Sequence, residues 1–187
     1  MTYNPNRHHR QSIRLRGYDY TQAGAYFVTI VIQNRELLLG EIVDRVMRLN
    51  DYGRVVLEEW NKLPARFSSV TLDASAIMPN HLHGIIMIGV DGKGKASAEH
   101  GVANAKISSA DALPLHPIGP ISGSLGAIVQ NFKSTSSRRI NTLRDTPGAK
   151  LWQRNYYERV VRNDRELNAI RQYVIANPLN WESDHER

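Results

Sequence analysis

Cysteine is absent from the 187 residues of the chain. Its absence excludes disulfide bonds, thiolate metal sites and cysteine nucleophiles, and leaves histidine, aspartate, glutamate and asparagine as metal ligands to consider. The chain also has no apolar run long enough to cross a bilayer, and residues 1–16 are polar and basic, without the apolar core of a secretory signal. We therefore expect a soluble, cytoplasmic protein that does not interact with a membrane.

Length and charge narrow the class of protein further. With 41% hydrophobic residues, residues 1–187 are enough for one well-buried domain and too few for two ordinary ones. The formal net charge of +6 is typical of proteins that bind phosphate backbones or anionic lipid, although a merely solvated basic surface explains it equally well.

Arginine predominates in the basic clusters, and its planar guanidinium suits phosphate oxygens. The clusters lie in a basic N-terminal arm (residues 1–16), in a later helix and near the C-terminus, where aromatic residues are interleaved. Such aromatics either stack on bases or belong to a buried core. The candidate nucleic-acid-binding residues are Arg14, Arg16, Lys133, Arg138, Arg139, Arg154, Tyr156 and Tyr157.

Hydrophobic patterning predicts five strands, one of them shorter than the others, and three helices. The predicted strands cover residues 25–32 (central), 40–49 (shorter, pairing with the central strand), 69–78, 81–88 and 157–162 (an edge strand). The first predicted helix begins at residue 50 or 51 and ends near Pro64. The second covers residues 122–141. The third begins at an Asn163 cap and stops at Pro178.

Residues 90–120 are rich in Gly, Ala, Ser, Lys and Pro and show no periodicity. They are either a flexible insertion or a binding loop that orders on its partner. Because the helices do not strictly alternate with the strands, the order of elements predicts an α+β fold with a mainly antiparallel sheet.

Two histidines begin the strand at 81–88. Since side chains alternate along a strand, His81 and His83 share one face, where two neutral imidazoles can bind a divalent metal ion. A pair with this spacing also arises by chance, so a structural role for both residues stays open.

The last helix places Tyr173 and Asn177 one turn apart on one face. If that face meets the histidine strand, the Asn177 amide oxygen can join the histidines on a metal while Tyr173 points at a bound phosphate. Helix termination before Pro178 and ordinary packing of Tyr173 are the alternatives. Tyr156 and Tyr157 are rival nucleophiles, but they lack this offset from an asparagine.

Four segments, in order, carry a family resemblance. Residues 78–83 (MPNHLH) resemble the HUH signature of single-tyrosine transposases, and residues 173–178 (YVIANP) resemble the tyrosine helix of REP-associated tyrosine transposases. Further similarity lies in residues 24–29 and 151–157. The resemblance covers most of residues 12–181 except the segment at 90–120, and the asparagine at position 177, where the insertion-sequence branch has glutamine, favours the REP-associated branch.

The resemblance implies a ferredoxin-like or RRM-like antiparallel sheet with helices packed on it. It implies that Tyr173 attacks single-stranded DNA to form a 5′-phosphotyrosine link, with His81, His83 and Asn177 holding Mg²⁺ or Mn²⁺. The implied partner is a DNA hairpin with a flanking guide sequence. Both a monomer and a homodimer that exchanges the tyrosine helix are compatible with the resemblance.

Two other functions stay open from the sequence. A non-catalytic module for single-stranded nucleic acid, with structural histidines, would share the fold and the charge. A metal-dependent hydrolase using activated water would leave free 5′-phosphate ends and would not need Tyr173.

Overall fold

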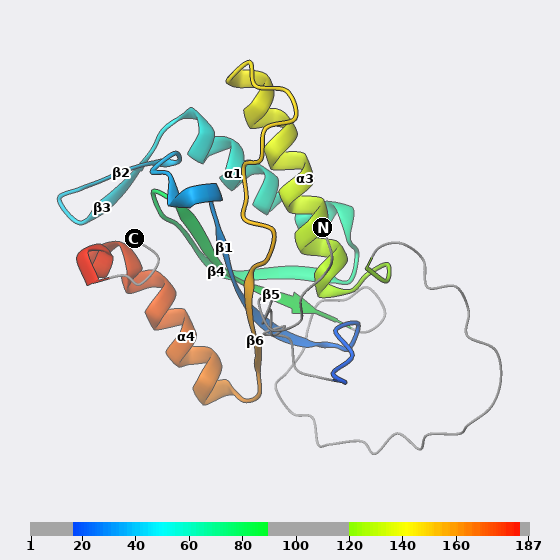
Figure 1. The fold of residues 1–187 in the computed structure, drawn as a ribbon. Helices are drawn as coiled ribbons and strands as arrows, with labels where there is room; N and C mark the ends of the chain where they lie inside the picture. The colour runs from blue at the N-terminus through cyan, green and yellow to red at the C-terminus, as the bar shows by residue number, and fades with distance from the viewer. Residues whose placement is uncertain (1–16, 90–119, 184–187) are drawn as a thin grey trace, which may run out of the picture.

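A four-stranded antiparallel sheet lies at the centre of the computed structural model, which describes residues 17–89 and 120–183 (Figure 1). The strand order is β4-β5-β1-β6. The strands are β1 (Gly24–Val31), β4 (Val70–Ile77), β5 (His81–Ile88) and β6 (Tyr157–Val161). The predicted central position of the first strand and the edge position of the last one are both confirmed.

Helices cover both faces of this sheet (Figure 1). They are α1 (Asp51–Asn61), the short α2 (Leu63–Arg66), α3 (Leu125–Leu143) and α4 (Asp164–Ala176), with 3-10 turns η1 (Gln33–Arg35) and η2 (Asn177–Ser183). Helices α1 and α3 pack on one face and α4 packs on the other. The order of β1, α1, β4, β5, α3 and β6 is the βαββαβ arrangement of ferredoxin-like folds, so the predicted α+β class is confirmed.

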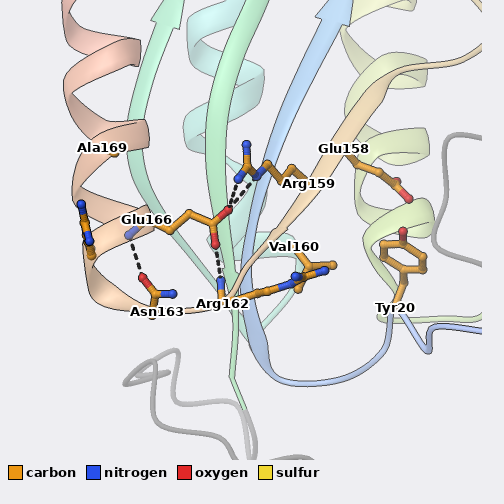
Figure 2. Close-up of a pocket in the computed structure, with 9 residues that line it drawn as sticks. Tyr20, Glu158, Arg159, Val160, Arg162, Asn163, Glu166 and Ala169 are labelled. Atoms are coloured by element: carbon orange, nitrogen blue, oxygen red, sulfur yellow. Dashed lines mark hydrogen bonds and ion pairs between the residues drawn. The ribbon is translucent and has the colours of Figure 1, made fainter.

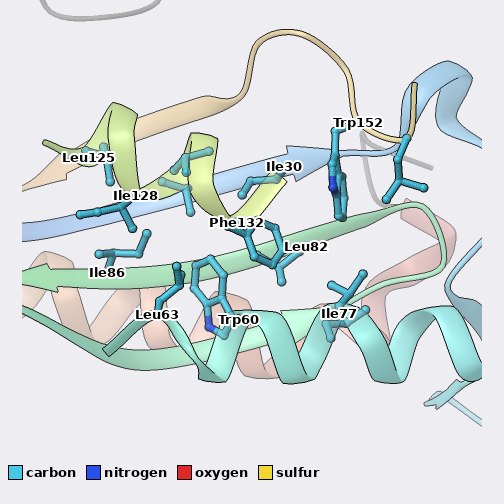
Figure 3. Packing of buried hydrophobic residues seen from close by; sticks show 14 of the residues in the cluster. Ile30, Trp60, Leu63, Ile77, Leu82, Ile86, Leu125, Ile128, Phe132 and Trp152 are labelled. Atoms are coloured by element: carbon cyan, nitrogen blue, oxygen red, sulfur yellow. The ribbon is translucent and has the colours of Figure 1, made fainter. Parts of the chain in front are cut away.

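Strand β1 is apolar along almost its whole length, as expected for a strand with both faces buried, and Thr29 is its polar exception. Tyr26, Val28 and Ile30 point toward α1 and α3, in the larger core shown in Figure 3. Ala25 and Phe27 point the other way, into a smaller core formed with α4. A strand with one solvent-facing side would have shown polar residues at every second position.

Side-chain caps begin the three long helices near the residues where the sequence predicts them. The side-chain oxygens of Asn50, Ser124 and Asn163 accept hydrogen bonds from backbone N–H groups in the first turns of α1, α3 and α4. The last helix ends at Ala176, and the chain then continues as the 3-10 turn η2, which contains Pro178.

One strand prediction is wrong. Residues 40–49 do not pair with the central strand but form a separate hairpin of β2 (Gly40–Val43) and β3 (Val46–Leu49). Both edges of β1 are already paired, with β5 and with β6. Asp44 and Arg45 both have positive φ angles, which suit the tight turn of an isolated two-residue hairpin.

Two predicted segments, the basic arm at 1–16 and almost all of the loop at 90–120, lie outside the described residues. The single domain predicted for residues 1–187 includes both segments and therefore stays a prediction.

A buried carboxylate joins the helices of the larger core. Glu59 on α1 is 1% exposed and forms ion pairs with Lys62, Arg66 and Arg139. Burial opposes ionisation of Glu59, but the hydrogen bonds from these cations outweigh it and lower its pKa to about 2. Arg139, one of the candidate nucleic-acid-binding residues, therefore ties α3 to α1.

The histidine strand is supported from its other face by an aromatic ring. Gly84 follows His83 and faces α1, and a Cβ added at Gly84 would lie 2.3 Å from Cζ2 of Trp60. The Trp60 side chain is 1% exposed and packs edge-on against Phe132. The glycine therefore lets the indole ring lie directly against the strand that carries the histidines.

Substitution of Gly84 by alanine should therefore lower the free energy of unfolding by about 2 kcal/mol, because the tightly packed Trp60 ring has to move. Gly24→Ala is the matched control: it lies in the same sheet, and its added Cβ would meet only ordinary contacts at 3.7 Å. Urea unfolding of both variants measures the difference. Equal stability of the two variants would contradict the proposed close packing.

Candidate active site

The two histidines of β5 lie side by side under α4, in the interior of the protein. His81 is 0% and His83 2% exposed, and their Nε2 atoms are 2.9 Å apart. Both side chains occupy the sheet face that packs against α4, as their alternation along the strand predicts. The two imidazole rings therefore direct their Nε2 atoms toward the same point.

The outer nitrogen of each ring is held by a second polar side chain. His81 Nδ1 donates to Asn80 Oδ1 at 2.7 Å, and His83 Nδ1 lies 2.8 Å from the hydroxyl of Thr29 on β1. Burial, assisted by the positive charge of Arg35, lowers the pKa of His81 to about 3. The His81 ring is therefore neutral, with its proton on Nδ1 and a lone pair on Nε2.

Helix α4 brings Tyr173 to this pair. The Tyr173 hydroxyl lies 3.4 Å from His83 Nε2, and its ring meets Phe27 and His83 edge-on. Ile170 and Val174, on the same helix, are buried against the sheet, and this packing fixes the position of the helix. Tyr173 is still 49% exposed, although its hydroxyl lies against a buried histidine.

Asn177 follows Tyr173 by one turn and is 3% exposed. Its Oδ1 atom is buried without a hydrogen-bond partner in the described part of the chain. Trp181, another turn further on, lies with its ring 6.2 Å from that of His81. Along the chain, Asn177 thus lies between Tyr173, which contacts His83, and Trp181, which lies near His81.

The spacing of the two ring nitrogens suits a divalent cation. Neighbouring ligands of an octahedral ion with bonds of about 2.1 Å are about 3 Å apart, close to the 2.9 Å between the two Nε2 atoms. Residues 17–89 and 120–183 contain no group of three His, Cys, Asp or Glu side chains suited to a metal. The amide oxygen of Asn177, buried and unpartnered among the described residues, is a candidate for a third protein ligand.

The two candidate base-stacking tyrosines have different surroundings. Tyr157 is 47% exposed and lies 6.2 Å from the ring of Phe27, which also contacts Tyr173. Tyr156 is partly buried against the larger core, with Lys133 Nζ 5.3 Å above its ring. Tyr157 is therefore the tyrosine of the pair that faces the histidine site.

Lys133 has a structural role in the chain itself. Its ammonium group donates to the carbonyl oxygens of Gln153, Arg154 and Asn155, and burial lowers its pKa to about 8. It therefore holds the segment that leads into β6 and Tyr157. A direct contact of Lys133 with nucleic acid stays a prediction.

The other basic candidates divide into three groups. Arg138 and Arg154 are exposed, whereas Arg139 is paired with Glu58 and Glu59. Arg14 and Arg16 lie outside the described residues.

A cavity of about 610 Å³ lies where β6 leads into α4 (Figure 2). Glu166 in its wall accepts hydrogen bonds from the Arg159 side chain and the Arg162 backbone, while Arg162 and Arg165 are exposed. Tyr173 lies seven residues beyond Glu166, about 10 Å along α4. Neither Tyr173 nor the two histidines lines the cavity. This cavity is therefore separate from the histidine site.

A protein of Haemophilus influenzae, described as uncharacterized, is 40% identical to this chain over 184 residues, which cover 97% of this chain and 95% of that protein. The chain belongs to the same family as this protein. No protein-family model matches the chain. The family is thus shown by similarity along nearly the whole length of both proteins.

A solved structure described as a REP-associated tyrosine transposase bound to a REP hairpin has a similar fold. The TM-score is 0.57 at 15% identity, and the match covers 90% of this chain and 73% of the other. At this identity the likeness shows the fold, including the antiparallel sheet expected from the motifs.

None of the helices in the two described segments combines the length and apolar character needed to cross a bilayer.

Three neighbours of the site were not predicted from the sequence. They are Thr29, Phe27 and Trp181, which contact or flank the two imidazole rings. Thr29 gave one signal, because it is a polar residue inside an otherwise apolar strand. The position of Trp181 depends on η2 and could not be inferred from local spacing.

Substitution of Asn177 tests whether its side chain binds a ligand or only stabilises the fold. If its unpartnered oxygen serves a ligand, Asn177→Leu should leave the free energy of unfolding in EDTA within about 1 kcal/mol of wild type, because the oxygen that is removed accepts no hydrogen bond from the described residues. Chemical unfolding with excess EDTA measures this. A loss above about 2 kcal/mol would show that the asparagine is needed for folding.

Proposed function

We propose that this protein is a transposase-type enzyme that cuts and rejoins single-stranded DNA, with Tyr173 as its nucleophile. The observation that carries the proposal is the half-exposed Tyr173 hydroxyl 3.4 Å from His83 Nε2, beside a histidine pair whose Nε2 atoms converge. The order of the four motifs along the chain and the fold shared with a REP-associated tyrosine transposase support it.

The proposed reaction is an exchange of phosphoesters. The Tyr173 oxygen attacks the phosphorus of a DNA phosphodiester, the bond from phosphorus to the 3′-oxygen breaks, and the phenolic proton ends on the released 3′-hydroxyl. The product is a 5′-phosphotyrosine. Because the phosphotyrosine keeps a phosphodiester bond, a second 3′-hydroxyl can reverse the step without ATP.

The protein's own groups divide this work. His81, His83 and Asn177 would hold Mg²⁺ or Mn²⁺, which when bound would withdraw charge from the phosphate oxygens. Phe27 packs against both the His83 and Tyr173 rings and orients the phenol toward the site. The buried rings exclude water from one side of the reacting groups, while the exposed side of Tyr173 admits the DNA.

The proposed partner is a single-stranded DNA hairpin with a flanking guide sequence. The structural neighbour is described as bound to a REP hairpin, and this chain carries a net charge of +6. Tyr157 offers an exposed ring beside the active site for base stacking. Arg138 and Arg154 are exposed candidates for phosphate contacts.

One observation favours a second candidate, a non-catalytic nucleic-acid-binding module. The two buried Nε2 atoms at 2.9 Å satisfy one another by a hydrogen bond and need no ion to remain in place. In such a protein the histidines would be structural, and Tyr173 would contribute only packing and stacking.

Incubation of labelled hairpin DNA with the purified protein and Mn²⁺ should give a covalent protein–DNA band on a denaturing gel. Tyr173→Phe should abolish the band, because it removes only the attacking oxygen. Tyr157→Phe is the matched control, an equally exposed tyrosine on the same face of the sheet, and should retain the band.

Cleavage that persists in Tyr173→Phe and leaves free 5′-phosphates would instead indicate a hydrolase. Tight binding without cleavage, with either metal and with hairpins of varied flanks, would favour the non-catalytic module.

A further inference from the structure

Two buried hydrogen bonds lie behind the histidine pair, on the side away from the converging Nε2 atoms. Thr29 is the cross-strand partner of His83 in the pairing of β1 with β5, and its hydroxyl is 2.8 Å from His83 Nδ1. Asn80 immediately precedes β5, and its Oδ1 is 2.7 Å from His81 Nδ1. Each ring therefore has one partner on its outer nitrogen.

Both partners are themselves fixed. Thr29 is 4% exposed and lies in the middle of the central strand. Asn80 is 0% exposed, its carbonyl oxygen accepts from Ile32 N at 2.8 Å, and its side-chain nitrogen donates to the Arg35 carbonyl. These two side chains therefore form rigid supports for the imidazoles.

The two supports differ in what they can do. The Asn80 oxygen can only accept, so it keeps the proton of His81 on Nδ1 and the lone pair on Nε2. The Thr29 hydroxyl can donate or accept. It can therefore pair with His83 both when the two Nε2 atoms share a proton and when both Nε2 lone pairs face a cation.

We propose that Thr29 and Asn80 are positioning residues that set the rotation and the protonated nitrogen of His83 and His81, and so make the pair competent to bind a divalent cation. The inference rests on the proposed function in so far as that function needs the cation. An imidazole without such a partner can rotate about the bond from Cβ to the ring and direct a protonated nitrogen at the ion. Partners of this kind typically contribute 10- to 100-fold to metal affinity.

The test measures Mn²⁺ binding to the metal-free, full-length protein without DNA, by the loss of the free-ion signal in electron paramagnetic resonance. Thr29→Val and Asn80→Leu remove the hydrogen bonds and should weaken binding by about 10- to 100-fold. Thr29→Ser and Asn80→Asp keep an oxygen at each position and should stay within a few-fold of wild type.

Thr142→Val is a control, since the hydroxyl of this threonine donates to the Arg138 carbonyl within α3, on an exposed part of the helix. Nitrogen NMR of the histidine rings supplies a second readout that packing alone would not move. It should show a loss of the single Nδ1–H form of His81 in Asn80→Leu. If Asn80→Leu fails to fold, the Mn²⁺ affinities of Thr29→Val and Thr29→Ser still test whether the hydrogen bond to His83 supports metal binding.

Equal Mn²⁺ affinity of Thr29→Val and wild type would overturn the inference and leave the proposed nuclease intact. Absence of Mn²⁺ binding by the wild-type protein would also overturn it. The gel assay reports separately on Tyr173, since the covalent band depends on the phenol and not on the affinity measured without DNA.

Discussion

The pairing of β5 with β1 is the constraint on which the site depends. Its register places His83 opposite Thr29 and His81 opposite Val31, at the end of two strands that are buried on both faces. Since side chains alternate along both strands, this one register directs both imidazoles and the threonine hydroxyl to the same side of the sheet. A shift by one residue would turn both rings into the opposite core.

The two faces of the sheet have separate tasks. On one face, Trp60 and residues of α3 belong to the larger core, and Trp60 packs against Gly84, which follows His83 in β5. On the other face, α4 is held by Ile170 and Val174, and it exposes half of Tyr173 beside His83. Strand β5 thus contributes different side chains to the larger core and to the proposed active site.

Much of this arrangement follows from local patterns. The alternation of His81 and His83, the Asn163 cap and the one-turn offset of Tyr173 and Asn177 can each be read from a few neighbouring residues. Local patterns do not determine the choice of partner, however. The predicted pairing of residues 40–49 with the central strand is therefore wrong, since nothing in that segment reveals that β1 is already paired on both edges.

The same limit applies to charge and to supporting contacts. A cluster of basic residues does not reveal that Arg139 is paired with Glu59, or that Lys133 binds three carbonyl oxygens, because these partners lie far away along the chain. Thr29 and Trp181 likewise became part of the site only through the folded sheet and η2. The sequence therefore identifies the residues of the proposed active site better than it identifies the residues that position them.

The central claim is that Tyr173 becomes covalently joined to DNA, and mass spectrometry of the trapped complex tests it most directly. After the DNA is trimmed to a short remnant, trypsin separates the candidate tyrosines, because cleavage follows Arg154, Arg159 and Arg171. Our account predicts the nucleotide mass on the peptide of residues 172–187, with fragment ions that place it on Tyr173. A nucleotide on the peptide of residues 155–159, which contains Tyr156 and Tyr157, would contradict it.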